Sequence, residues 1–357
     1  MFACDPIVKQ ERKCIVVGRA ATGIYLVLSN ECEPGKEVVV PANICYAAIF
    51  PIIYAGMMPR FCDVDPESGN VSFETFQAAC SAQTCAAIVP HMYGNPVASM
   101  RQIASYCKLN HILLIEDCAS AMGAEADYPL GRMGDYTIYS MGYSKTLDLG
   151  CGGLVCSEKD LTGLLEAEQE LPMLTVEAEK SIGFFSKVYR TTRNYGQGSE
   201  LEKCIYRELP GCLRGAFLYR ISEHKKRQLY SRIADLPQVI QVRRRMLQLY
   251  ERNLEDCRFH SYHFSQGAVP WRFNLLCGPG RQVVIAEMLK RGYPVSDWYP
   301  SVVRMFEDVG EYAGAEWHEN HIINFPLLIE EAEVEAICAL LTRLSYEYPD
   351  DSYAQRQ

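Results

Sequence analysis

The sequence of 357 residues lacks several features that would assign it to a simple class. No run approaches the ~18 apolar residues of a membrane span, and the first residues lack the charged-then-apolar order of a signal peptide. The net charge of -9 leaves no basic stripe for nucleic acid. No Gly-x-Gly-x-x-Gly follows the first predicted strand, and no P-loop is complete. These absences predict a soluble chain with neither a membrane nor a nucleic-acid partner.

Cysteine pairs at metal-binding spacing are also missing, although the sequence contains 16 cysteines. None of them forms a Cys-x-x-Cys pair, and no set of cysteines and histidines completes a zinc site. In a reducing compartment such cysteines behave as small buried hydrophobes. We therefore expect a reduced, cytoplasmic protein without a metal site.

Two short basic clusters, residues 225–227 and 243–245, stand out from the acidic background. Both lie in helix-like sequence among Leu, Ile and Tyr. This setting predicts that their side chains form a solvated helix face.

Residues 18–157 alternate between helix-like segments and apolar strand-like runs. Continuous apolar strands separated by helices of about a dozen residues indicate a mostly parallel sheet covered by helices on both faces. Ligands of such sheets gather beyond the carboxyl ends of the strands. The predicted helices are 20–30, 45–56, 73–83 and 97–109; the predicted strands are 37–42, 60–65, 86–93, 111–117, 136–141 and 153–157.

The pattern changes after residue 160. Residues 160–250 are helix-like with many charges and no convincing strand. Strand-like and helix-like segments then follow, which predicts a smaller α+β unit at the C-terminal end. Its predicted strands are 268–277 and 322–326, and its predicted helices are 280–291 and 330–341.

Lys145 stands in a setting that predicts a cofactor site. Asp117 ends an apolar strand, Ser140 precedes the lysine by five residues, and Gly152-Gly153 follow it. A lysine that forms a Schiff base with pyridoxal phosphate (PLP) needs a carboxylate at the pyridinium nitrogen and a cradle for the phosphate. Asp117 can supply the carboxylate, and Ser140 with the backbone N–H groups near Arg19-Ala20 can supply the cradle. The two glycines would let the backbone pass close to the cofactor.

Six motifs, taken in chain order, extend this interpretation. They resemble the nucleotide-sugar aminotransferases of the DegT/StrS type, which are PLP-dependent enzymes of the aspartate-aminotransferase fold (fold type I). The resemblance is strong over residues 18–157 and weaker over about 236–345. The motifs are Gly18-Arg-Ala-Ala-Thr-Gly-Ile-Tyr-Leu, Pro34-Gly-Lys-Glu-Val-Val-Val-Pro, Tyr54-Ala-Gly through Asp63-Val-Asp-Pro, His91-Met-Tyr-Gly-Asn-Pro, Glu116-Asp-Cys-Ala-Ser-Ala-Met-Gly, and Ser140 with Lys145 and Gly152-Gly153.

The resemblance implies an α/β fold in two domains and a role for each matching residue. The large PLP-binding domain would span residues 1–235, including the helical segment 160–235, and the small α+β domain residues 236–357. Lys145 matches the lysine that binds PLP and moves the proton, and Asp117 matches the acid at the pyridinium nitrogen. Ser140 matches a phosphate ligand, and Arg19 and Ala20 fall where backbone amides bind the phosphate.

Several positions depart from the family pattern. Ser120 falls where the family usually has Gln or His near the ring face, and it is too short to do quite the same job. The segment 218–223 carries Leu218 in place of an Asn that reaches the neighbouring subunit's phosphate, although Arg220 is retained. About 30 residues that usually precede the first helix, with a Thr-Gly element that touches the sugar nucleotide, have no counterpart. We expect intact cofactor machinery and a remodelled substrate side.

Three residues are candidates for substrate binding. Arg220 or Arg272 could bind the amino donor's carboxylate, because a guanidinium matches a carboxylate bidentately. Trp298, like Arg272, lies where the small domain would face the pocket, and core packing is an equally open interpretation for both. His91 is predicted to be a satisfied histidine at a strand end, outside the site.

The resemblance implies an aminotransferase that works in two steps. An amino group would pass from glutamate (or glutamine) through PLP on Lys145 to a keto-sugar linked to a nucleotide, in surface polysaccharide or antibiotic sugar synthesis. A His in place of Lys145 would instead indicate a dehydratase. A homodimer is expected because family sites are completed across a twofold interface. Two alternatives stay open: a non-catalytic PLP-binding or regulatory protein, and an aminotransferase of a non-sugar ketone.

Overall fold

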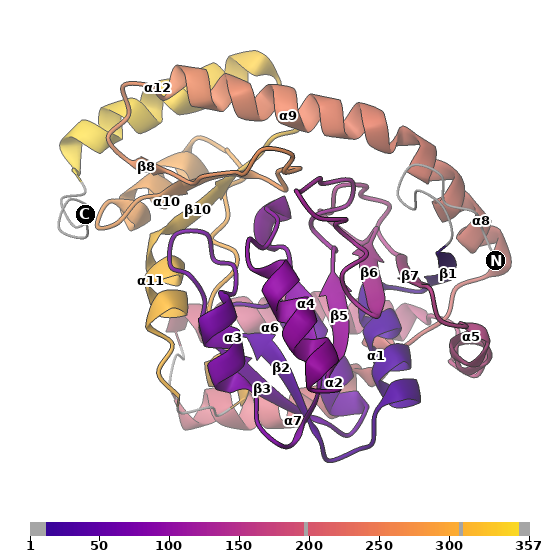
Figure 1. The fold of residues 1–357 in the computed structure, drawn as a ribbon. Coiled ribbons are helices and arrows are strands. Elements are labelled where there is room, and N and C mark those ends of the chain that lie inside the picture. The colour runs from indigo at the N-terminus through magenta and orange to yellow at the C-terminus, as the bar shows by residue number, and fades with distance from the viewer. Residues whose placement is uncertain (1–11, 196–198, 307–309, 350–357) are drawn as a thin grey trace.

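The computed structural model in Figure 1 describes residues 12–195, 199–306 and 310–349. The chain start, where no signal peptide is predicted, lies outside the described residues. No helix of the described chain is both long and apolar enough to cross a membrane.

The first half of the chain contains a seven-stranded sheet with the strand order β1-β7-β6-β5-β4-β2-β3. Neighbours among β2 to β6 are parallel, whereas β7 is antiparallel to both β6 and β1. This confirms the mostly parallel sheet. The strands are β1 (Lys13–Val17), β2 (Glu37–Pro41), β3 (Met58–Cys62), β4 (Thr84–Pro90), β5 (Leu113–Asp117), β6 (Tyr136–Ser140) and β7 (Gly153–Ser157), and the helices between them are α1 (Ala20–Glu31), α2 (Tyr46–Tyr54), α3 (Phe73–Ala79) and α4 (Met100–Leu109).

Alternate side chains of the strands enter two different cores, so both faces of the sheet are covered (Figure 1). Val38 and Val40 of β2 pack with the apolar side chains of α1 and α2. Val39 points to the other face and packs with those of α3 and α4. Burial on both faces explains why these strands are continuous apolar runs in the sequence.

Strand β1 was not predicted, because the alternating pattern was expected to begin at residue 18. The apolar run Cys14–Val17 is too short to have a periodicity that separates a strand from a buried helix turn. Its pairing with β7 brings Cys14 opposite Cys156, and the structure joins the two in a disulfide. The expectation that every cysteine is reduced is therefore wrong at this pair.

The second half of the chain is helical up to Asn253, as predicted, and then forms a three-stranded antiparallel sheet in the order β10-β9-β8. Tyr250 of α9 stacks on Phe273 of β9, with ring centroids 4.3 Å apart, inside a separate core. The elements are α5 (Thr162–Gln169), α6 (Val176–Tyr195), α7 (Glu200–Phe217), α8 (Glu223–Ser231), α9 (Leu236–Asn253), β8 (His260–Ser261), β9 (Phe273–Leu276), α10 (Arg281–Lys290), α11 (Ala313–His321), β10 (Ile322–Phe325) and α12 (Glu331–Glu347).

The predicted strand 268–277 is shortened to Phe273–Leu276. Its first part crosses to the first half of the chain instead: the Val269 N–H donates to the carbonyl of Gly94, and the Trp271 N–H to that of Tyr93. Pairing with residues 93 and 94 thus overrides the strand tendency of the apolar run, and it places residues 269–271 at the carboxyl edge of the large sheet.

The prediction that both basic clusters form solvated faces is wrong for one residue in each. Lys226 is buried and pairs with buried Glu168, Nζ to Oε2 2.7 Å. Arg243 is buried in α9, where its guanidinium donates to backbone carbonyls. A cluster of like charges has one member on the inner side whenever the helix that carries it packs on the protein.

Candidate active site

The predicted cofactor residues meet at the carboxyl edge of the large sheet. Asp117 ends β5 and Ser140 ends the neighbouring strand β6. Strand β1 ends at the same edge and leads through Gly18 into α1, where Arg19 forms a backbone bridge with Gly152. The strand ends and the first turn of α1 therefore surround one region, although they are far apart in sequence.

The glycines around Lys145 bring α1 close to β7. The Gly152 N–H donates to the Gly18 carbonyl at 2.8 Å, and a Cβ at Gly153 would lie 2.7 Å from the Ala20 nitrogen. A side chain at Gly153 would thus collide with the start of α1, and a close approach of the two glycines to the cofactor stays a prediction. The start of α1 has no side-chain cap, and uncapped N–H groups at a helix start are suited to binding a phosphate.

Asp117 is a buried acid with one satisfied oxygen: its side chain is 8% exposed, and Oδ1 accepts from the Ala119 N–H at 2.8 Å. Burial raises the pKa of Asp117, and the Ala119 N–H, Lys145 and His91 only partly oppose this. A buried carboxylate of this kind gains stability from a positively charged hydrogen-bond donor beside it.

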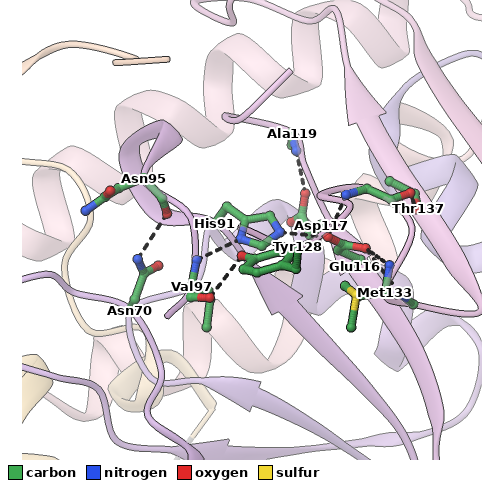
Figure 2. A network of polar contacts seen from close by, with 12 residues as sticks. Asn70, His91, Asn95, Val97, Glu116, Asp117, Ala119, Tyr128, Met133 and Thr137 are labelled. Carbon is green, nitrogen blue, oxygen red and sulfur yellow. Dashed lines mark hydrogen bonds and ion pairs between the residues drawn. The ribbon is translucent and has the colours of Figure 1, made fainter. Parts of the chain in front are cut away.

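A rigid polar network lies behind Asp117 (Figure 2). His91 Nδ1 accepts from the Val97 N–H, which leaves Nε2–H to donate to Glu116 Oε1 at 3.0 Å. The Glu116 carboxylate also accepts backbone N–H groups from Gly131, Met133 and Gly134. Burial alone would raise the pKa of Glu116, but the His91 contact and these donors lower it overall. His91 is therefore a satisfied strand-end histidine, as predicted.

The Lys145 amine donates to Ser120 Oγ at 3.2 Å. Burial lowers the pKa of Lys145, but Tyr299, Cys45 and Asp117 outweigh it, so that the pKa is raised overall. Among the described residues no ion pair joins Lys145 to Asp117, although each shifts the pKa of the other.

Ser140 and Arg19 differ in which of their atoms face the site. Ser140 is buried, and its Oγ accepts from the Gly142 N–H at 3.3 Å, at the start of the lysine loop. The guanidinium of Arg19 lies on Phe217 and donates to the Ala216 carbonyl at 2.8 Å. Arg19 and Ala20 therefore offer their backbone to the site.

The three candidate substrate residues lie in different places. Arg272 lies beside the lysine loop, with Nη2 3.5 Å from Ser144 Oγ. The Trp298 ring stacks on Tyr189 of α6 at 5.7 Å, and its neighbour Tyr299 contacts Lys145. Arg220 donates from Nε to the Leu171 carbonyl at 2.9 Å, and within the described chain no contact joins it to Lys145.

Sequence reasoning did not assign to the site two residues that lie at the lysine. Tyr299 lies close enough to Lys145 to raise the pKa of that amine, and its own pKa is raised chiefly by burial. Arg243 of α9 donates from Nη2 to the Lys145 carbonyl at 3.3 Å. The signal for Arg243 was its place in line with Leu236, Met246 and Tyr250, which are the buried residues of the same helix.

These groups fit PLP. The donor set combines a half-buried amine, a buried acid at a strand end, a hydroxyl and an uncapped helix start. They match the aldehyde, the ring nitrogen and the phosphate of that cofactor.

Comparison with known proteins gives one family and one fold. The sequence model of the DegT/DnrJ/EryC1/StrS aminotransferase family matches residues 8–342. GDP-perosamine synthase of Vibrio cholerae is 32% identical over 147 residues, 41% of this chain and 40% of that protein. L-glutamine:2-deoxy-scyllo-inosose aminotransferase of Streptomyces fradiae is 32% identical over 157 residues, 43% of this chain and 37% of that protein.

The alignments with these curated relatives thus span only about two fifths of their length. A solved GDP-4-keto-6-deoxy-D-mannose-3-dehydratase of E. coli with bound hydrated PLP has the same fold, with a TM-score of 0.71 and 16% identity. The superposition covers 95% of this chain and 89% of that one. The predicted PLP-dependent transferase fold is thereby confirmed, and the chain belongs to the DegT/DnrJ/EryC1/StrS aminotransferase family of PLP-dependent enzymes.

Proposed function

We propose that this chain is a PLP-dependent aminotransferase that moves an amino group from glutamate or glutamine to a nucleotide-linked keto-sugar. The half-buried Lys145 amine, which donates to Ser120 at the edge where β5 and β6 end, is the observation that carries the proposal. PLP, when bound, supplies the electron sink that makes the donor's Cα–H bond acidic.

In this proposal the protein's own groups hold the ring and move the proton. Asp117 would hold the ring nitrogen, where its buried charge would favour the protonated form. Ser140 and the backbone at Arg19 and Ala20 would bind the phosphate. Lys145 would hold and move the proton of the donor's Cα, and this needs its neutral amine.

Ser120 and Tyr299 hold the Lys145 amine between transfers. Tyr299 stabilises the charged amine, since it raises the Lys145 pKa. Ser120 occupies a position where the family usually has a longer side chain, and here its hydroxyl contacts the lysine itself. With Ser120 in place of the longer side chain, the Lys145 amine has a hydroxyl as its hydrogen-bond partner and is still held in position.

Arg272 is the better of the two candidates for the donor's carboxylate. It lies next to the loop that carries Lys145, although its Nη1 also donates to the Pro294 carbonyl at 3.1 Å, whereas Arg220 donates to the Leu171 carbonyl. A half-buried guanidinium beside the lysine loop can hold a carboxylate bidentately. Trp298, beside Tyr299, is our candidate for a contact with the keto substrate.

The substrate class rests on likeness to GDP-perosamine synthase, whose name indicates a GDP-linked sugar. The inosose aminotransferase has the same percentage identity to this chain, and its name contains a ketone but no nucleotide. A non-sugar cyclic ketone is therefore the second candidate. We also infer a cytoplasmic homodimer from the family resemblance.

One experiment separates an aminotransferase from a protein that only binds PLP. The protein is loaded with PLP, and a band near ~420 nm is followed before and after glutamate or glutamine is added. We expect the donor to remove the band and release one equivalent of its 2-keto acid, and borohydride to fix PLP on Lys145. Lys145→Ala should show neither result. A stable band that neither donor changes would reject the aminotransferase and favour the PLP-binding protein.

A further inference from the structure

The loop from Gly142 to Gly150 carries Lys145, and a few short-range bonds shape it. Ser144 has a φ of 63°, which is uncommon for a residue other than glycine. Its N–H donates to Asp148 Oδ2 at 2.7 Å, and the Lys145 N–H donates to the Gly142 carbonyl at 3.2 Å. These bonds satisfy the N–H groups of residues 144 and 145. Their carbonyls need other partners.

Both carbonyls are bound by groups from the C-terminal half of the chain. The Trp271 indole Nε1–H donates to the Ser144 carbonyl. Arg243 Nη2 donates to the Lys145 carbonyl at 3.3 Å, while its Nη1 donates to the Trp271 carbonyl at 2.7 Å and the Pro270 carbonyl at 3.2 Å. The Arg243 guanidinium thus joins Lys145 to residues 270–271, and the Trp271 side chain of this segment also binds the carbonyl of Ser144.

The environment of Arg243 suits a structural clamp. Its side chain is 4% exposed, and no carboxylate forms an ion pair with it within the described chain. Burial, and then the charge of Arg272, lowers its pKa to about 10, so it remains a cation at neutral pH. An apolar residue would be expected on this buried helix face, and the fork of donors that reaches three carbonyls accounts for an arginine there.

We propose that Arg243 is a positioning residue for Lys145, which sets the place of the lysine amine by binding its backbone carbonyl across from α9. The inference rests on the proposed role of Lys145. Helix α9 starts beside the large sheet and ends in the core of the small sheet (Figure 1). Arg243 therefore connects the reacting lysine to the part of the molecule that carries Arg272 and Tyr299.

The next residue offers a matched control. Arg244 donates to the carbonyls of Gly267 at 2.9 Å and Ala268 at 3.2 Å. It therefore binds the same connecting segment as Arg243, but its bonds go to carbonyls other than that of Lys145. Loss of either arginine removes a guanidinium from the same helix, and only loss of Arg243 frees the lysine carbonyl.

The test compares Arg243→Met and Arg243→Lys with Arg244→Met in the full-length protein. We expect Arg243→Met to bind PLP about tenfold more weakly, the size expected for losing a hydrogen bond from a charged donor. Arg243→Lys should recover part of the affinity, because it keeps the charge and can reach one carbonyl. Arg244→Met should bind PLP as the unmodified protein does, even where its melting temperature falls by the same amount.

A second readout needs no cofactor. Amide hydrogen exchange of peptides that cover residues 141–150 should be faster in both Arg243 variants than in Arg244→Met. Equal exchange and equal PLP affinity in the Arg243 and Arg244 variants would overturn the proposal. If Arg243→Met does not fold, Arg243→Lys gives the same decision. Should the unmodified protein bind no PLP, the proposed function fails, and the exchange data still decide whether Arg243 holds the lysine loop.

Discussion

The edge of the large sheet and the C-terminal half of the chain hold Lys145 by different means. At the sheet edge, Asp117 and Ser140 stand at the last positions of adjacent strands, so sheet pairing alone places them. From the C-terminal half, Arg243 and Tyr299 reach the lysine from a helix and a loop that share no sheet with it. The chemistry expected of the cofactor comes from the first region, and the position of the lysine depends on both.

This difference has a counterpart in the comparisons with relatives. The curated relatives align with about two fifths of the chain, and the motifs that carry the resemblance lie within residues 18–157. The motifs of the resemblance thus lie in the region of the sheet edge, although the family model itself matches residues 8–342. Substitutions in the two regions should therefore change different properties of the protein. The following four predictions run from the largest expected effect to the smallest.

Asp117→Ala should abolish most of the transfer activity at the sheet edge. Loss of a preorganised charge at a reacting group lowers kcat by about 100-fold or more. The measurement is the rate of 2-keto acid release from glutamate or glutamine. Asp117→Glu serves as the control, since it keeps the charge and should retain part of the rate. Activity of Asp117→Ala within about threefold of the unmodified protein would show that the acid does not serve the ring nitrogen.

Glu116→Gln should destabilise the sheet edge itself. The folded-state pKa of Glu116 is lowered, so its contribution to stability is present above the usual pKa of a glutamate and is lost as pH falls through the lowered value. We expect the free energy of unfolding to fall by about 3 kcal/mol near neutral pH, because a buried charged network is broken. Urea unfolding measured at several pH values should show the difference shrinking in acid.

The exposed Glu67 gives the matched control, and Glu67→Gln should leave the unfolding curve unchanged. A difference for Glu116→Gln that stays constant into acid would contradict the assignment of the lowered pKa to the folded protein.

Arg272→Met tests the substrate side of the comparison. If its guanidinium binds the donor's carboxylate, KM for the donor should rise about tenfold, the size of one charged hydrogen bond, with a smaller change in PLP affinity. Steady-state rates against donor concentration measure this. Arg220→Met is the control and should leave KM unchanged. The reverse result, with KM raised only by Arg220→Met, would move the carboxylate site to residue 220.

Tyr299→Phe should have the smallest effect. Tyr299 raises the Lys145 pKa, so removal of the hydroxyl lowers that pKa and exposes more neutral amine at a given pH. In cofactor-free protein, an amine-specific reagent should label Lys145 faster at neutral pH, by less than about tenfold. Tyr143→Phe, at an exposed tyrosine of the same loop, should not change the labelling rate. Slower labelling of Tyr299→Phe would reverse the assigned direction.

The predicted elements of the first half agree with the structure because they repeat a strong local pattern. Helix α1 and strands β2, β5 and β7 lie within a few residues of their predicted positions. Strand β8, with two residues, offers too little sequence to show a period, and β1 lies before residue 18, where the alternating pattern was expected to begin; both pair with a neighbouring strand. The boundary near residue 235 between two domains stays a prediction.

The candidate site divides in the same way. Lys145, Asp117 and Ser140 could be found because each follows a strand, and a parallel sheet brings its strand ends together. Lys226 and Arg243 were placed in solvent because a charge on a helix is usually exposed, although the line of Arg243 with Met246 and Tyr250 marks the covered side of α9. Both are buried because another segment supplies an ion-pair partner or carbonyls.

The sequence by itself determined the order of strands and helices, the acid, the hydroxyl and the lysine at one sheet edge, and the family to which the chain belongs. Local periodicity and motif order suffice for these, because they are properties of adjacent residues. Only the tertiary structure decided that Ser120 and Tyr299 meet the Lys145 amine and that Arg243 holds its carbonyl. These contacts join residues 25 or more positions apart, so they depend on how separate elements pack, and no local pattern encodes that.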